Sequence, residues 1–381
     1  MMEFNALYEE LGLNSTQSDE ERVQILAQWC YEKVSRDIRF TDKLEDNYEN
    51  YEELATDYLE EFLINIPLDL GEEVAAFEGR NAIQAAAFLG LDQAIASLNP
   101  QRDLLNKPDA HGNTPLHIAA LAGHFYTVSV LLDLGAAFDN PNKQSQLPIF
   151  SALEMPMLYE DGLKEKKIRI FRLLREKSPK TLEHQDISGD TVLHLMAIHD
   201  FSTLLAEVLK TNPELALIKN NYFCYPIHTA ILNNKIDCVR SLLAMEQATI
   251  LADSKGRLAL HYAARYSDKD ITILCCDASE DLNVLDGRGR TAIMLAAQAG
   301  NNAALNVLVD KGADVHAIDS EGYSALHYAV LAGHLETVRW LLANTTIDFN
   351  APDSKQQTPL ALCNTPEKIQ IKNLLLERGA I

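Results

Sequence analysis

The sequence lacks the patterns typical of secretion, membrane insertion and common enzyme chemistry. Its start, MMEFNALYEELGL, has no basic segment followed by an apolar stretch, so we expect no ordinary secretory leader. No uninterrupted apolar run approaches the ~18–20 residues of a membrane span. None of the six cysteines lies in a C-x-x-C pair, which favours free thiols in a reducing compartment.

Motifs of catalysis are also missing. The chain has no phosphate-binding loop, serine elbow, paired-carboxylate site or kinase motif in order. No group of His, Cys and acidic residues has metal-ligand spacing. We therefore predict no enzyme, no catalytic residue, no cofactor and no metal.

Positive charge is scarce. The 381 residues include 33 Lys and Arg against 55 Asp and Glu, a net charge of −22. General nucleic-acid binding is disfavoured because phosphate contacts need a positive surface, and anionic membranes should repel the chain. Residues 1–75 carry 20 acidic and 5 basic side chains, net −15, which predicts a domain boundary near residue 75.

What the chain does contain is a repeat. NTPLHIAALAGH begins at Asn113, and related strings such as SALHYAVLAGH at Ser324 recur along the sequence. The positions equivalent to Thr114 are 81, 114, 147, 191, 225, 258, 291, 324 and 358, so all spacings but one are 33 or 34 residues. A regular period of this length is typical of stacked repeat proteins, in which each unit needs its neighbours to bury its apolar faces.

These motifs resemble those of the ankyrin-repeat family, in nine copies over residues 76–381. The resemblance implies an all-α solenoid of helix-loop-helix units with short β-hairpin tips. The residues agree independently: Thr114 suits a helix N-cap, Pro115 a first helical turn, and Gly123 a left-handed helix end. The family resemblance also implies structural hydrogen bonds for the histidines at seven repeat positions: His117, His124, His194, His228, His261, His327 and His334.

The segment 1–75 does not follow the repeat. Ser18 and Glu21 form a capping box before a predicted helix, and a second helix is predicted from Tyr48 to about Ile64. One interpretation is a small helical cap over the apolar end of the first repeat; the alternative is a module that binds a partner or does chemistry. Cys30 is the one nucleophile there worth naming, and no histidine precedes His111 to activate it.

Repeat three departs from the period. Its spacing of 44 indicates an insertion of about eleven residues, and Leu163–Lys180 carries a net charge of +6. We predict a lengthened second helix there. Its basic face is either solvated or a docking surface for an acidic partner or for the acidic N-terminal segment. Whether this repeat keeps the stack continuous or forms a hinge stays open.

The resemblance implies that a partner binds to hairpin tips and to residues near the end of each first helix, which line the concave face. In repeat five, three aromatics occupy a tip where glycine is expected at position 223; they either pack on neighbouring tips or anchor an interface. Repeats six to eight add mostly basic and aromatic side chains. The predicted partner-binding residues are Tyr222, Phe223, Tyr225, Lys255, Arg257, Arg265, Tyr266, Arg288, Arg290, Glu321 and Tyr323.

We therefore expect a monomeric, non-enzymatic scaffold or adaptor in the cytoplasm, with a partner protein that offers an acidic or apolar epitope. It would bind neither nucleic acid nor the membrane interior. The chain is also loosely similar to ankyrin-repeat effectors that intracellular bacteria deliver into host cells. Two alternatives remain: an enzyme or regulatory module in the N-terminal segment with the repeats as a targeting domain, or an acidic segment that covers the basic patch until a partner displaces it.

Overall fold

The computed structural model describes residues 73–74, 80–98, 100–155, 162–245 and 247–381. The chain forms two compact units, Met1–Ile187 and Ser188–Ile381. The predicted helical cap in residues 1–75, including Cys30, lies outside the described residues except for the strand Glu73–Val74.

The first unit is built from helices in two layers. A two-residue antiparallel ladder of β1 (Glu73–Val74) and β2 (Arg80–Asn81) precedes them. The first helices α4, α7 and α9 contact one another in sequence, and so do the second helices α5, α8 and α10. The bounds are α4 Ala82–Leu89, α5 Asp92–Leu98, α6 Arg102–Leu105, α7 Pro115–Ala122, α8 Phe125–Asp133, α9 Pro148–Ser151, α10 Leu163–Lys177 and η3 Pro179–Glu183.

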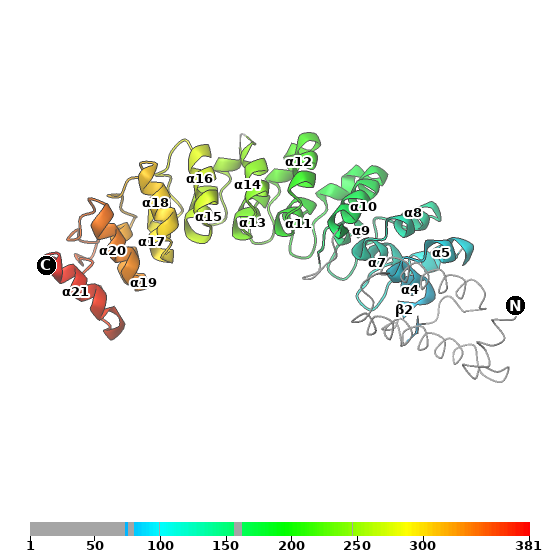
Figure 1. Ribbon diagram of the computed structural model, residues 1–381, viewed down its shortest axis with the longest axis horizontal. Helices are drawn as coiled ribbons and strands as arrows, with labels where there is room; N and C mark the ends of the chain where they lie inside the picture. The colour runs from blue at the N-terminus through cyan, green and yellow to red at the C-terminus, as the bar shows by residue number, and fades with distance from the viewer. Residues whose placement is uncertain (1–72, 75–79, 99, 156–161, 246) are drawn as a thin grey trace, which may run out of the picture. The chain divides into compact units, whose positions relative to one another are not determined.

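The second unit repeats the same arrangement. Helices α11, α13, α15, α17 and α19 form one row, and α12, α14, α16, α18, α20 and α21 form the other (Figure 1). The bounds are α11 Val192–Ile198, α12 Ser202–Thr211, η4 Pro213–Leu217, α13 Pro226–Leu232, α14 Ile236–Leu243, η5 Ala248–Ile250, α15 Ala259–Tyr266, α16 Lys269–Ala278, α17 Ala292–Ala299, α18 Asn302–Asp310, α19 Ala325–Ala332, α20 Leu335–Asn344, η6 Pro366–Lys368 and α21 Ile369–Glu377. The predicted all-α solenoid of helix pairs is confirmed.

Histidine fixes the start of the first helices. The Nδ1 atom of His117 accepts the backbone N–H of Thr114 at 3.2 Å, and its Nε2 lies 3.0 Å from the carbonyl oxygen of Gln146 in the next tip. Only a neutral ring protonated at Nε2 satisfies both contacts. His261 repeats the pattern with Leu258 and Arg290, so the predicted structural hydrogen bonds are confirmed for His117 and His261. His228 keeps only half of the pattern: its Nδ1 accepts the Tyr225 N–H at 3.2 Å, but its Nε2 has no hydrogen-bond partner within the described residues.

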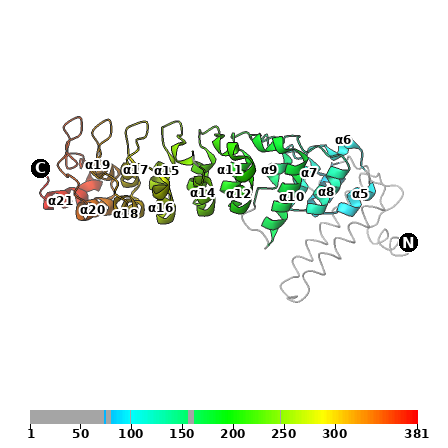
Figure 2. The ribbon, with the colours of Figure 1, turned by 90° about the horizontal axis from the view of Figure 1, so that it is seen from above.

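Among the described residues, strands are assigned only before α4, where β1 pairs with β2; in the other described tips, hydrogen-bonded turns replace the predicted β-hairpins. In the second unit the loops before α15, α17 and α19 project from one edge of the helix rows (Figure 2). Adjacent tips lie so close that the N–H of Gly287 donates to the Lys255 carbonyl at 2.8 Å. A Cβ on Gly256, whose φ is +71°, would lie 2.7 Å from the Gly287 nitrogen, so this position needs glycine.

Not all basic side chains of helix α10 belong to the solvated or docking face that the sequence predicts. Lys167 is fully buried, and its Nζ donates to the Ser151 carbonyl at 3.0 Å. Burial lowers the pKa of Lys167 to about 8, an effect that Glu154 opposes. The Arg169 guanidinium lies 4.3 Å from the centre of the Phe125 ring. Lys167 therefore belongs to the interior of repeat three, whereas the exposed Arg169 lies against α8 of the preceding repeat.

Candidate protein-binding surface

Each tip of the second unit is organised by one acidic or amide side chain. Oδ1 of Asp253 accepts the backbone N–H groups of Lys255 and Arg257, both at 2.8 Å. Asp286 accepts those of Arg288 and Arg290 at 2.9 and 3.0 Å. These bonds close the turn in the absence of strands, so they set where the following side chains lie.

The second oxygen of each carboxylate holds an arginine. Arg257 donates to Asp253 Oδ2 from Nε at 2.8 Å and from Nη2 at 2.6 Å. Arg290 binds Asp286 Oδ2 in the same way, at 2.9 and 2.7 Å. Burial alone would raise the pKa of Asp286, but the Arg290 side chain and the backbone N–H groups hold it below its usual value.

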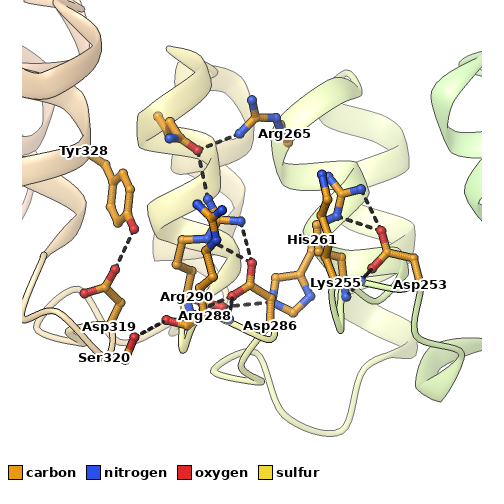
Figure 3. Close-up of polar contacts among 12 residues, drawn as sticks. Asp253, Lys255, His261, Arg265, Asp286, Arg288, Arg290, Asp319, Ser320 and Tyr328 are labelled. Atoms are coloured by element: carbon orange, nitrogen blue, oxygen red, sulfur yellow. Dashed lines mark hydrogen bonds and ion pairs between the residues drawn. The ribbon is translucent and has the colours of Figure 1, made fainter.

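The two tips and two helix ends enclose a hollow of about 260 Å³ between α15 and α17 (Figure 3). We call it the basic hollow. It is lined by Lys255, Arg257, Arg265, Tyr266, Arg288, Arg290 and Gln298. Six of these seven are residues that the sequence predicted for partner binding, and repeats six and seven bring them together.

Arg265 is held in place at the helix end. Its Nη1 donates to Oε1 of Gln298 at 2.6 Å, and the same oxygen lies 3.3 Å from Nη1 of Arg290. The guanidinium also lies 5.3 Å from the centre of the exposed Tyr266 ring. These contacts orient Arg265 before any ligand arrives, which lowers the entropy lost on binding.

The other predicted binding residues lie outside the lining of the hollow. Tyr222 and Phe223 stand 72% and 46% exposed at the tip before α13, so they do not pack into neighbouring tips. Tyr225 is partly buried, with its ring 5.8 Å from that of His228. Glu321 is exposed, whereas the partly buried Tyr323 contacts Tyr328, its ring 5.8 Å away.

The predicted binding residues do not include the carboxylates that hold the arginines of the hollow. Asp253 and Asp286 each precede an arginine by four positions, and they are separated by the 33-residue period. Tyr262 is also absent from the predicted set. Its hydroxyl donates to Asp253 Oδ2 at 2.9 Å from the buried face of α15. The repeated Asp-x-x-x-Arg spacing was the signal available for the two pairs.

The described cysteines are buried free thiols: Cys224, Cys238, Cys275, Cys276 and Cys363. Burial raises the pKa of Cys276 to about 11 and raises that of its neighbour Cys275 as well. Neither thiol forms a significant thiolate population at neutral pH, so both act as packing residues. Within the described residues, no helix is both long and apolar enough to cross a membrane.

Fold and site together define a helix-pair repeat protein with a charged surface between adjacent repeats. Family models for ankyrin repeats match residues 193–284, 260–353 and 306–380 as repeat arrays and residues 111–145 as a single repeat. Together these matches span more than half of the chain, which belongs to the ankyrin-repeat family. Members of this family generally mediate protein–protein interactions.

Several curated proteins are similar over part of the chain. The Transient receptor potential cation channel subfamily A member 1 homolog of Caenorhabditis elegans is 28% identical over 179 residues, which is 46% of this chain and 14% of that protein. The Transient receptor potential cation channel subfamily A member 1 of Homo sapiens is 25% identical over 183 residues, which is 46% of this chain and 15% of that protein. The Nuclear factor NF-kappa-B p105 subunit of Gallus gallus is 32% identical over 95 residues, which is 24% of this chain and 10% of that protein. The chain thus spans less than a sixth of each of these relatives.

Proposed function

We propose that this protein is a non-enzymatic scaffold of nine ankyrin repeats that binds the acidic segment of a partner protein. The binding surface consists of the basic hollow, the tip aromatics Tyr222, Phe223 and Tyr225, and the adjoining Glu321 and Tyr323. These residues occupy the tips and first-helix ends that form the concave face in the family. The observation that carries the proposal is the convergence of five cationic side chains on one hollow in a chain of net charge −22.

Charge complementarity explains why such a surface favours an acidic partner. The overall negative charge would repel an acidic protein at long range, so attraction has to come from a local positive patch. The exposed aromatics add apolar area of the kind that anchors interfaces. Specificity then comes from the combination of the two, because a partner must present acidic and apolar groups at the right separation.

The test is affinity capture from cell lysate with the full chain. Lys255→Ala/Arg265→Ala/Arg288→Ala removes the three cations of the hollow that form no ion pair with a carboxylate of the described residues and leaves the two Asp–Arg pairs intact. Arg240→Ala/Lys269→Ala/Arg339→Ala is the matched control, because it removes the same charge from exposed sites on α14, α16 and α20. A partner lost only with the first variant supports the proposal; capture that is equal for both variants contradicts it.

The proposed function includes a location. We propose that the protein acts in a cytoplasm, as a secreted effector that binds a host protein, because its repeats resemble those of ankyrin-repeat effectors. A translocation reporter fused to the full chain tests this directly. Reporter signal inside host cells that depends on a bacterial secretion system supports it, and retention of the reporter in the producing cell contradicts it.

A further inference from the structure

We propose that the basic hollow binds a phosphorylated serine or threonine side chain of the partner. This inference rests on the proposed function and specifies the group that the hollow takes. The argument uses the charge of the hollow, the geometry of its donors and its size.

The hollow carries more positive charge than its own carboxylates neutralise. Asp253 and Asp286 pair with Arg257 and Arg290. Within the described residues, no carboxylate forms an ion pair with Lys255, Arg265 or Arg288. Five cations against two carboxylates leave a charge of +3 around one small space. A single Asp or Glu side chain brings one negative charge, whereas a phosphomonoester brings about −1.5 to −2 at pH 7 and matches the surplus more closely.

The donor set also suits a phosphoryl group. Planar guanidinium groups bind two oxygens of one phosphate at once, and an ammonium adds a third donor without a fixed direction. Arg265 is already oriented by Gln298 and by the Tyr266 ring. The Arg288 side chain is exposed on the neighbouring tip, whose backbone Asp286 holds in place. Lys255 lies on the preceding tip, so the three cations approach the hollow from different sides (Figure 3).

Size limits the alternatives. A volume of about 260 Å³ lies below the ~300–1,000 Å³ of typical small-molecule sites and accommodates one phosphorylated side chain. A nucleic acid needs a continuous positive track for its successive phosphates. The exposed Glu321 lies on the next tip, so the surface turns acidic in that direction and does not continue the positive charge.

The experiment uses the full chain and three peptide arrays with degenerate flanking sequence, whose central residue is phosphoserine, glutamate or serine. We expect the phosphoserine array to be retained at least tenfold more tightly than the glutamate array, with serine retained least. The Lys255→Ala/Arg265→Ala/Arg288→Ala variant should lose this preference, and the matched surface control should keep it. Arg265→Lys/Arg288→Lys keeps the charge without the two-oxygen geometry and should lose most of the preference.

Equal retention of the glutamate and phosphoserine arrays would overturn the inference, and so would tighter binding of a single-stranded oligouridine. Inorganic phosphate should compete with the phosphoserine array at millimolar concentration, and failure to compete would also count against it. Phosphatase treatment of the lysate separates the two proposals. If capture is lost with the triple variant but survives the phosphatase, the scaffold function stands and the phosphate site fails. If capture does not respond to the triple variant, both fail.

Discussion

Phe223 adopts a left-handed backbone conformation at a position that glycine occupies in most of the neighbouring tips. Its φ is +61°, and glycines fill the equivalent position of the tips before α11, α15, α17 and α19. A bulky residue in the left-handed region costs about 1–2 kcal/mol. The aromatic ring recovers little of this by burial, since it is nearly half exposed beside Lys219. A strained, exposed aromatic at a tip is therefore consistent with selection for contact with a partner.

This strain leads to a prediction for Phe223→Gly. The variant should raise the free energy of unfolding of the second unit by about 1 kcal/mol, because glycine removes the cost of the positive φ. It should at the same time weaken partner capture by removing an interface anchor. Urea unfolding followed by circular dichroism measures the first effect.

Two controls make the Phe223 result specific. Tyr222→Ala removes an exposed ring at an unstrained position and should leave stability within about 0.5 kcal/mol of the parent. Gly256→Ala introduces a Cβ where the next tip's backbone lies 2.7 Å away and should destabilise. A Phe223→Gly variant that is less stable than the parent would show that the ring packs better than its exposure indicates.

At the scale of the element, the tip loops depend on one side chain each. Asp253 and Asp286 close their turns with Oδ1 and bind an arginine with Oδ2. Asn220 closes the tip before α13 with its Oδ1 alone, accepting the N–H groups of Tyr222 and Cys224 at 3.0 Å. The backbone role thus needs only an oxygen, and the negative charge serves the arginine.

The prediction that follows concerns Asp286→Asn. The amide oxygen should keep the turn, but the largely buried Arg290 would lose its carboxylate, at a cost of about 2 kcal/mol. The pKa of Asp286 is lower in the folded protein than in the unfolded chain. As the pH falls, this carboxylate is therefore protonated in the unfolded chain before it is protonated in the folded protein. This contribution to stability is present above the usual carboxyl pKa and is lost as the pH falls below it.

Thermal unfolding at pH 7 and at pH 3 checks this prediction. The difference between parent and Asp286→Asn should be clear at pH 7 and smaller at pH 3. Asp109→Asn is the control, since Asp109 closes a tip through the N–H groups of His111 and Asn113 and has no arginine at the fourth position. An equal decrease in thermal stability for both variants would show that the Asp286 carboxylate contributes more through the turn than through its ion pair with Arg290.

At the scale of the whole molecule, the same histidine contact recurs in both units, so its protonation state affects the entire stack. Burial lowers the pKa of His117 and of His228 to about 4, from an ordinary value of 6.5. It lowers the pKa of His261 and His327 too. Protonation at Nδ1 would place a hydrogen against the N–H that this atom accepts in His117, which couples ring charge to helix capping.

We expect the protein to lose stability between pH 6.5 and about 4. In this window the histidines of the unfolded chain are protonated, whereas the same histidines in the folded protein stay neutral. The free energy of unfolding therefore falls as the pH is lowered. A shift from 6.5 to about 4 corresponds to roughly 3 kcal/mol for each such histidine at the acidic end. Urea midpoints measured across this window test it. A midpoint that stays flat from pH 6.5 to 4.5 would show that these rings already titrate normally in the folded state.

The spacing of the residues alone predicts the helix pairs of this protein and the positions of most candidate binding residues. The 33-residue period places Thr114, His117 and Gly123 at fixed positions, and each has a local role that needs no long-range information: a helix start, a cap and a helix end. The same period places Lys255, Arg265 and Arg288 at tips and helix ends. The helix pairs and most of the candidate binding residues were therefore predictable.

What spacing could not decide was how the remaining cations are placed. The Asp-x-x-x-Arg spacing indicates the Asp253–Arg257 pair, but no such pattern predicts that Arg265 is held by Gln298 of the next repeat while Arg288 extends to the surface. Lys167 belongs to a basic run but is buried against the Ser151 carbonyl. The sequence by itself determined the repeating element and the positions it exposes. Only the tertiary structure decided where those side chains lie, because burial and contacts such as that between Arg265 and Gln298 depend on distances between residues of neighbouring repeats.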